Sequence, residues 1–282
     1  MIAMKKLRMT GIIILGLAIV LGFCYQQGII HSSSNQYIKS STPTIFFHGW
    51  GSSAHAEQHM VNAAKRAGIT KTVIQANVNK KGHVTLIGKI SRHANNPIVM
   101  ANYADNKNSD YHQDGKYALN VIKKLQNTYH FKQINLVGHS MGNMSISFYL
   151  LDNANNQKLP QLNKQVAIAG HFDGIKGRDL PSNLEIDSHT GQPNRMSPAY
   201  KQLLGLRSIY PKPAKVLNVY GDIGDGSDGQ VTNESSKTMR YLVAGRAASY
   251  QEKKFSGKQA QHSKLHSNKA VDRTLIKFLW TK

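Results

Sequence analysis

A short apolar run that ends in a glycine-flanked serine restricts the fold of this chain more than any other feature. The run is Ile134 to Val137, helical spacing follows over residues 141–150, and the motif between them is Gly138-His139-Ser140-Met141-Gly142. Strand, serine and helix in this order form a sharp turn, in which glycines let the two backbones approach and the serine stands at the apex. Ser140 is therefore the candidate nucleophile.

The rest of the chain, from about Pro43 onward, alternates between strand-like and helical patterns. Helical spacing of apolar residues occurs at 54–66, 118–125, 141–150 and 268–280. This alternation implies right-handed crossovers and a mostly parallel sheet with helices on both faces, so the predicted fold class is α/β in one domain, residues 43–282. The expected strands are 44–47, 72–76, 84–90, 98–102, 134–137, 165–169, 216–220 and 249–255.

Residues 170–212 interrupt the alternation with a stretch that contains Gly, Pro and Asn and has little periodicity. The stretch is too long for an ordinary connection in a compact domain. It is either a lid-like insertion over the site or a surface excursion without a function, and the sequence supports both interpretations.

The first 30 residues have the composition of an export signal. Lys5, Lys6 and Arg8 precede an uncharged apolar run over residues 11–25. The run is long for a signal peptide and slightly short for a transmembrane helix, and no small-residue cleavage site follows it. We expect a membrane anchor that holds the domain outside the cell through a polar tether, residues 31–42, or a secreted domain if the signal is cleaved.

Cysteine content and charge narrow the chemistry and the partners. The single cysteine, Cys24, lies in the apolar run, so the exported domain has no disulfide, no thiolate metal site and no cysteine nucleophile. The 36 Lys and Arg against 15 Asp and Glu give a formal charge of +21. Such a surface suits an anionic cell-wall polymer or a membrane surface. Nucleic acid is not an expected partner, because the lysines are scattered and no nucleic-acid-binding motif is present.

A second glycine-rich turn follows the first expected strand, at His48-Gly49-Trp50-Gly51. A loop here can direct the backbone N–H of Trp50 at a substrate carbonyl oxygen, and the N–H of Met141, at the start of a helix, can supply the second donor. These two N–H groups are the candidate oxyanion hole. The alternative is that His48 and Gly49 only form a turn after a strand.

A loop after the strand 216–220 holds the candidate acid. In hydrolases of this type the acid and then the histidine follow the serine along the chain. The loop contains Asp222, Asp225 and Asp228 among glycines. Asp228 is preferred because the apolar Val231 can fix this part of the loop, and the other two aspartates remain alternatives. The same spacing of carboxylates also suits a calcium ion.

The candidate base lies in the loop after the last expected strand. His262 and His266 are both present there, ahead of the final helix. Either can take the proton of Ser140 and return it to a leaving group. His262 is preferred because it comes earlier in the loop, whereas His266 is close enough to the helix to cap it. His139, inside the serine motif, is expected to pack beside the turn.

With these residues in place the chain resembles the α/β-hydrolase superfamily from about Pro43 to the C-terminus. More narrowly, it is similar to cell-surface α/β hydrolases of Gram-positive bacteria, a family of unknown function. In small bacterial lipases the catalytic histidine begins a similar His-x-x-Leu stretch, and this favours His262. The matching strings are Phe47-His48-Gly49-Trp50-Gly51-Ser52, Val137-Gly138-His139-Ser140-Met141-Gly142, Ser227-Asp228-Gly229-x-Val231 and Ala260-Gln261-His262-Ser263-x-Leu265-His266-x-Asn268.

The resemblance implies esterase- or lipase-like chemistry without a cofactor or a metal, but it implies no particular substrate. We therefore expect a serine hydrolase that cleaves a small-molecule or lipid ester through an acyl-enzyme on Ser140. The alternative reactions on the same three residues are those of an amidase, a peptidase or a thioesterase. The alternative class is a non-catalytic module that binds cell-surface polymers.

Overall fold

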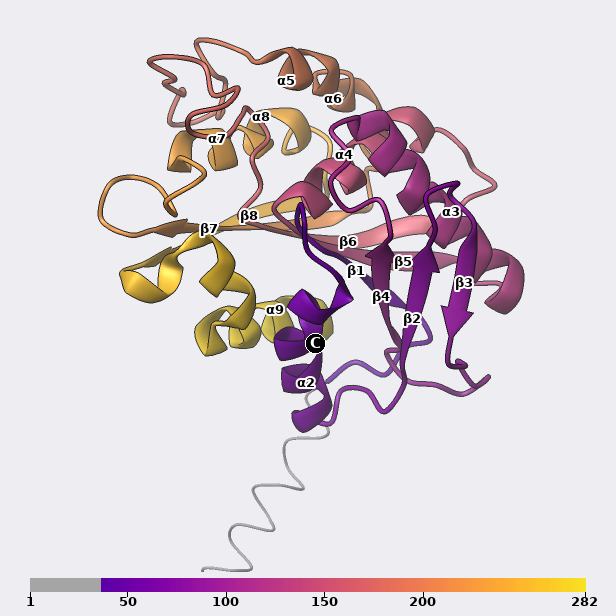
Figure 1. Ribbon diagram of the computed structural model, residues 1–282. Helices are drawn as coiled ribbons and strands as arrows, with labels where there is room; N and C mark the ends of the chain where they lie inside the picture. The colour runs from indigo at the N-terminus through magenta and orange to yellow at the C-terminus, as the bar shows by residue number, and fades with distance from the viewer. Residues whose placement is uncertain (1–36) are drawn as a thin grey trace, which may run out of the picture. The chain divides into compact units, whose positions relative to one another are not determined.

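Eight strands form one sheet in the computed structural model, which describes residues 37–282 (Figure 1). Their order across the sheet is β3-β2-β4-β1-β5-β6-β7-β8, and each neighbouring pair is parallel except β2 with β3. This mostly parallel sheet confirms the predicted α/β class. The strands are β1 (Thr44–Phe47), β2 (Val73–Val78), β3 (Val84–Ile87), β4 (Ile98–Tyr103), β5 (Gln133–His139), β6 (Gln161–Ile168), β7 (Lys215–Asp222) and β8 (Ser249–Ser256).

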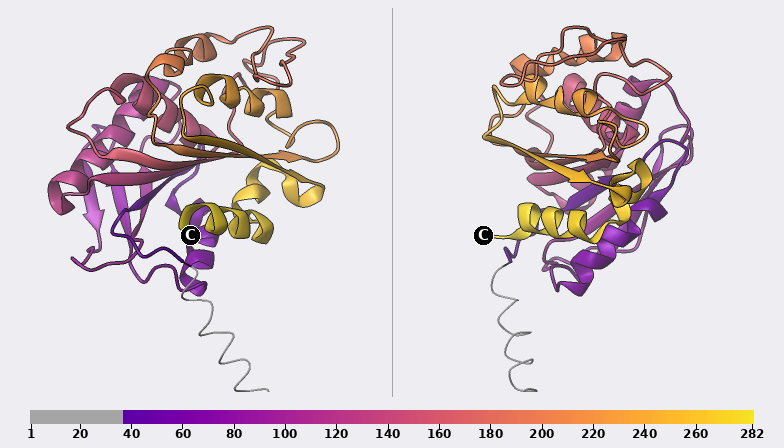
Figure 2. Two further views of the ribbon diagram at one scale, coloured as in Figure 1. Left: turned by 180° about the vertical axis from the view of Figure 1, so that it is seen from behind. Right: turned by 90° about the vertical axis from the view of Figure 1, so that its left-hand side faces the viewer.

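Helices cover both faces of this sheet within residues 39–279. Helices α3 to α8 lie on one face, and α2 and α9 lie on the other (Figures 1 and 2). The helices are α2 (Gln58–Arg66), α3 (Tyr111–Tyr129), α4 (Met141–Asn153), α5 (Pro198–Leu203), α6 (Leu206–Ile209), α7 (Asn233–Lys237), α8 (Met239–Val243) and α9 (Lys269–Trp280), with the 3-10 helices η2 (Ala54–Glu57), η3 (Lys258–Ala260) and η4 (His262–Ser267).

The central strands are buried because helices cover them from both sides. All four residues of β1 are buried, and so are six of the seven residues of β5. Strands enclosed in this way read as continuous apolar runs rather than alternating patterns. The strand that leads to Ser140 therefore lies at the centre of the core, and its carboxyl end is held rigidly.

The two helices next to the serine motif approach each other closely at Gly115 of α3. A Cβ atom at this position would lie 2.8 Å from the backbone N of Tyr149 and 2.9 Å from the carbonyl carbon of Phe148, both in α4. Asp110 starts α3 by accepting hydrogen bonds from the N–H groups of His112 and Gln113. The contact fixes α4, and therefore the serine motif at its N-terminus, against α3.

Residues 170–212, the predicted insertion, connect β6 to β7 and contain two short helices, α5 and α6. Ser197 caps α5 by accepting a hydrogen bond from the N–H of Tyr200, whose ring is fully buried. Helices this short have too few turns to produce a visible periodicity. The antiparallel pairing of β3 was also not predicted; the connection from β2 is a tight turn in which Gly82 adopts a φ of +81°.

The ends of the described chain pair with each other. Tyr37 and Thr281 form an antiparallel bridge, and the N–H of Ile38 donates to the carbonyl of Trp280 at 2.7 Å. The predicted export segment, residues 1–30, and half of the predicted tether, residues 31–36, lie outside the described residues. Within residues 37–282, no helix is both long enough and apolar enough to cross a bilayer.

One buried carboxyl group, Asp114 in α3, makes stability depend on pH. Neither carboxyl oxygen has a hydrogen-bond partner among the described residues, and burial raises the pKa of this group to about 8, with Asp105 and Asp110 adding repulsion. In the unfolded chain the same aspartate has the ordinary pKa of about 4. Between these two values the folded chain holds a proton that the unfolded chain has released, so stability falls as the pH rises.

The Asp114→Asn variant should lose less stability than the wild type between pH 5 and pH 8. The expected difference in slope is at most about 1.4 kcal/mol per pH unit, the effect of one proton. Burial also raises the pKa of Glu57 to about 8. Its contribution to the pH dependence of stability is the same in both proteins. Urea unfolding at four pH values measures this, with the exposed Glu185→Gln as control. Parallel stability curves for wild type and Asp114→Asn would contradict it.

Candidate active site

Ser140 occupies the sharp turn between β5 and α4 in a strained backbone conformation. Its φ of +51° and ψ of −121° are unusual for a residue with a side chain and cost about 1–3 kcal/mol. The N–H of Ser140 donates to the carbonyl of Ile168 in β6 at 3.0 Å, which helps to hold this conformation. The turn directs the Ser140 hydroxyl away from the core at the carboxyl edge of the sheet.

The two glycines of the serine motif are required by close backbone contacts. A Cβ atom on Gly142 would overlap the carbonyl oxygen of Phe47 at the end of β1. A Cβ atom on Gly138 would lie 2.7 Å from the backbone N of Asn143. The start of α4 therefore packs directly against the ends of β1 and β5, as the spacing of the motif indicated.

The three residues proposed from sequence as nucleophile, base and acid lie in one hydrogen-bonded chain. Nε2 of His262 is 2.9 Å from Oγ of Ser140, and Nδ1 of His262 is 2.8 Å from Oδ2 of Asp228. The side chains come from the turn after β5, the loop after β7 and the start of η4. Because a carboxylate only accepts, Nδ1–H donates to Asp228, and Nε2 is left to accept the Ser140 hydroxyl.

The carboxylate of Asp228 is held by its own loop. Its Oδ1 accepts hydrogen bonds from the N–H groups of Gln230 at 2.9 Å and Val231 at 2.7 Å. The Val231 side chain is buried, and the N–H of His262 donates to the carbonyl of Asp228 at 2.8 Å. The loop therefore fixes both the acid and the backbone of the histidine that it contacts.

The two alternative aspartates have other partners. Asp222 accepts from the N–H groups of Gly224 and Gly226 and pairs with Lys254 at 3.1 Å. Asp225 accepts from Ser227 and pairs with Lys176 at 3.0 Å. These contacts lower the pKa of both carboxyl groups. Neither bonds to His262, and within residues 37–282 no group of three or more His, Cys, Asp or Glu is arranged to hold a metal ion.

The loop after β1 lies against the serine. His48 donates from Nδ1 to the carbonyl of Gly49 at 2.9 Å and accepts at Nε2 from the N–H of Tyr103 at 3.1 Å, so its ring is neutral. Burial lowers the pKa of His48, in agreement with this. A Cβ atom on Gly49 would lie 3.2 Å from Cβ of Ser140. His48 thus holds the loop, and Gly49 allows its close approach.

Both residues predicted to form the oxyanion hole border the cavity in front of Ser140. Met141 is the first residue of α4, where backbone N–H groups have no partner within the helix. The Trp50 side chain is half exposed, and Nζ of Lys107 lies 5.6 Å from the centre of its ring. Both residues therefore lie beside the cavity, as the prediction of the oxyanion hole requires.

Two further histidines surround His262. His139 donates from Nε2 to the carbonyl of His262 at 3.0 Å, and its ring centre lies 5.1 Å from that of His262. The His266 ring meets His139 edge-on at 4.8 Å. Burial lowers the pKa of both His139 and His266. His139 supports the backbone that carries His262, whereas His266, the alternative base, packs on His139 and forms no bond to Ser140.

The cavity at this site has a volume of about 410 Å³ and contains residues that the sequence did not single out. Tyr111 comes from the start of α3, and His171 and Arg178 come from the segment after β6. The sequence marks these residues only weakly, by their position after a predicted parallel strand. Ligands bind outside the carboxyl ends of such strands, so polar residues that follow a strand often lie at a ligand site.

The sheet, the serine turn and the hydrogen-bonded side chains together define an α/β hydrolase. Residues 31–282 match the family described as "Alpha/beta hydrolase of unknown function (DUF915)", and the chain belongs to this family. This confirms the resemblance that the motifs indicated. Among curated proteins, none matches this chain.

Solved structures share the fold at low sequence identity. The product of the gene lin2722 from Listeria innocua is 24% identical, with a TM-score of 0.76 over 85% of this chain and 94% of that one. A protein from Lactobacillus plantarum, described as a cell-surface hydrolase, is 19% identical, with a TM-score of 0.68 over 84% of this chain and 89% of that one. Because so little of the sequence is shared, these likenesses support the fold alone.

Proposed function

We propose that this protein is a serine hydrolase that cleaves carboxylic esters through an acyl-enzyme on Ser140. The observation that supports this best is the chain of hydrogen bonds from Ser140 Oγ to His262 and on to Asp228, with distances of 2.9 and 2.8 Å. The same arrangement of serine, histidine and carboxylate activates a hydroxyl that is otherwise a weak nucleophile.

The proposed reaction gives each of these residues a step. Nε2 of His262 takes the proton of Ser140 as Oγ attacks the ester carbonyl carbon, and Asp228 stabilises the imidazolium that forms. The N–H groups of Trp50 and Met141 stabilise the oxyanion. His262 then protonates the departing alcohol, and a water molecule, deprotonated by the same Nε2, releases the acid and restores Ser140.

We also propose that the enzyme acts outside the cell. The composition of residues 1–30, with a basic start and an apolar run, supports export. The related Lactobacillus plantarum protein is described as a cell-surface hydrolase, which agrees with that location. The formal charge of +21 favours association with an anionic wall polymer or membrane surface, and such binding would weaken as salt is added.

Labelling with a fluorophosphonate probe tests the proposed chemistry directly. The probe should modify Ser140 in the folded protein and should leave it unmodified after unfolding, because only the folded site activates the hydroxyl. Rates on matched ester, thioester and amide substrates then separate an esterase from the alternative hydrolases. A folded protein that neither reacts with the probe nor hydrolyses any substrate of the panel would instead be a binding module.

A further inference from the structure

We infer that the cavity beside Ser140 selects esters that carry a negatively charged group, a carboxylate or a phosphate, with Arg178 and His171 as the residues that recognise it. This inference rests on the ester hydrolase function proposed above. It narrows the substrate class, and it differs from the lipid-like acyl group that the sequence left open.

The lining of the cavity is about as polar as it is apolar, so it offers hydrogen-bonding groups as well as apolar surface. Pockets for apolar ligands are lined mainly by hydrophobic and aromatic side chains. Here the hydrophobic and aromatic side chains are Trp50, Tyr111, Met141 and Ile175. Serine, asparagine, glutamine and histidine side chains make up most of the remainder. A substrate that carries hydrogen-bonding groups can therefore pair with the polar part of these walls.

Among the described residues that line the cavity, Arg178 alone carries a permanent charge. It is exposed, and among the described residues its guanidinium forms no ion pair. The neighbouring Asp179 accepts a hydrogen bond from the N–H of Ile175 at 2.8 Å, and its charge acts on Tyr111 and His171 together with that of Arg178. Asp228 is buried and bonds to His262. An unpaired arginine in a cavity without a lining carboxylate favours an anionic group, which its planar fork can bind through two hydrogen bonds.

His171 adds a neutral donor on the same segment. Its side chain is nearly fully buried, its ring lines the cavity, and its Nδ1 has no hydrogen-bond partner among the described residues. Burial lowers the pKa of His171 to about 4, so the ring is neutral at pH 7. A buried N–H without a hydrogen-bond partner is rarer than a buried acceptor without one. Nδ1 therefore carries no hydrogen, and the ring hydrogen is on Nε2. The ring therefore offers an N–H donor to the cavity, as an oxygen-rich substrate group requires.

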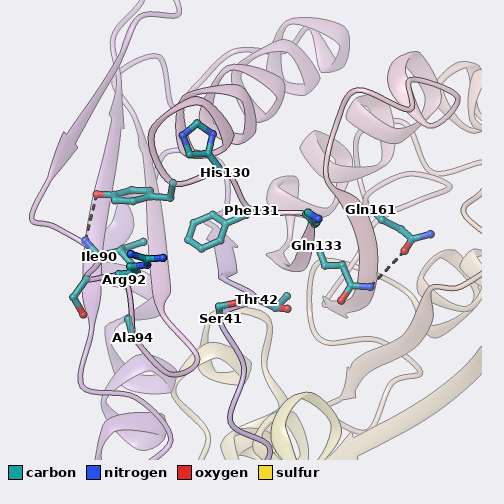
Figure 3. Close-up of a pocket in the computed structure, with 12 residues that line it drawn as sticks. Ser41, Thr42, Ile90, Arg92, Ala94, His130, Phe131, Gln133 and Gln161 are labelled. Atoms are coloured by element: carbon teal, nitrogen blue, oxygen red, sulfur yellow. Dashed lines mark hydrogen bonds between the residues drawn. The ribbon is translucent and has the colours of Figure 1, made fainter.

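A second basic cavity provides the control. It has a volume of about 720 Å³ and lies at the amino ends of β1, β5 and β6, the edge of the sheet opposite Ser140 (Figure 3). Arg92, His130 and Lys132 line it together with Phe131. Arg92→Glu therefore makes the same change of charge as Arg178→Glu, but far from the serine.

Two matched pairs of esters place the negative charge on either side of the scissile bond. The first pair is p-nitrophenyl hydrogen adipate against p-nitrophenyl heptanoate, with the charge on the acyl side. The second is 1-butyrylglycerol 3-phosphate against 1-butyrylglycerol, with the charge on the alcohol side. In at least one pair the wild type should prefer the charged ester by about tenfold in kcat/KM, a modest charge-assisted contact because Arg178 is exposed.

Variants then assign the preference to the cavity. Arg178→Ala should bring the ratio of the two rates close to one, and Arg178→Glu should invert it. His171→Phe should reduce the preference, and His171→Gln, which keeps an N–H donor, should retain part of it. Arg92→Glu should leave the ratio unchanged.

The outcomes separate this inference from the function on which it rests. If wild type shows no preference in either pair, or if Arg178→Glu slows charged and neutral esters alike, the selectivity is wrong and the ester hydrolase stands. If the preference is present but Arg92→Glu removes it equally, the overall field of the protein causes it and the assignment to Arg178 is wrong. If no ester is hydrolysed and Ser140 resists the fluorophosphonate, the proposed function itself fails.

Discussion

Replacing Ser140 by alanine should lower kcat for ester hydrolysis by about 10⁴-fold or more, the loss seen when the nucleophile of such a site is removed. The variant cannot form the acyl-enzyme, so only binding and the oxyanion donors remain. His262→Ala should cost about as much, and the double variant little more, because the two residues act as one unit. Initial rates on p-nitrophenyl butyrate, with enzyme concentrations raised to reach the slow variants, measure these effects.

A neighbouring serine serves as the control for this prediction. Ser263 borders the same cavity and its side chain is exposed, but it lies outside the hydrogen-bonded chain. Ser263→Ala should keep kcat within about threefold of wild type, the range of a substitution that removes no specific interaction. The fold of Ser140→Ala should be intact, since the strain lies in the backbone. A Ser140→Ala protein that retains a tenth of the wild-type rate would refute the assignment of the nucleophile.

The sequence predicted the central strands β1, β4, β5 and β7 well because helices bury this part of the sheet from both sides, and buried strands are continuous apolar runs. Their ends were harder to predict. Strand β6 begins at Gln161, four residues before the predicted start, because its pairing with β5 depends on the backbone rather than on side-chain type. Lys164 lies in this part, and its ammonium donates to the carbonyls of Phe278 and Leu279 at the end of α9. Only the tertiary structure supplies these partners.

The site residues likewise divide into those that a local motif marks and those that only the tertiary structure brings to the site. The serine motif is visible in the sequence because close packing at Gly138 and Gly142 restricts residue type over a few adjacent positions. His171 and Arg178 were not predicted, since nothing local marks them. They reach the cavity because β6 lies beside β5, so the segment that follows β6 begins next to Ser140. Contacts made across the sheet leave no short motif.

The acid was the least certain residue in the sequence, because three aspartates share one loop. Replacing Asp228 by asparagine should lower kcat by about 10³–10⁴-fold while the fold is kept. An asparagine amide at the position of Oδ2 donates to Nδ1 of His262, so the ring must carry its hydrogen on Nε2. That nitrogen then cannot accept the Ser140 hydroxyl, and the histidine is present but in the wrong tautomer.

The other two aspartates are the matched controls for this change. Asp222→Asn and Asp225→Asn remove the same charge from the same loop. They weaken the pairs with Lys254 and Lys176, and Asp222→Asn also weakens the hydrogen bond from Asn233. Such pairs contribute about 0–1 kcal/mol to stability, so both variants should stay folded. Their kcat should therefore stay within about threefold of wild type. Activity near pH 9 adds a second test, because more hydroxide should partly restore the Asp228→Asn rate when the base is disabled. If either control loses more activity than Asp228→Asn, the acid has been assigned to the wrong residue.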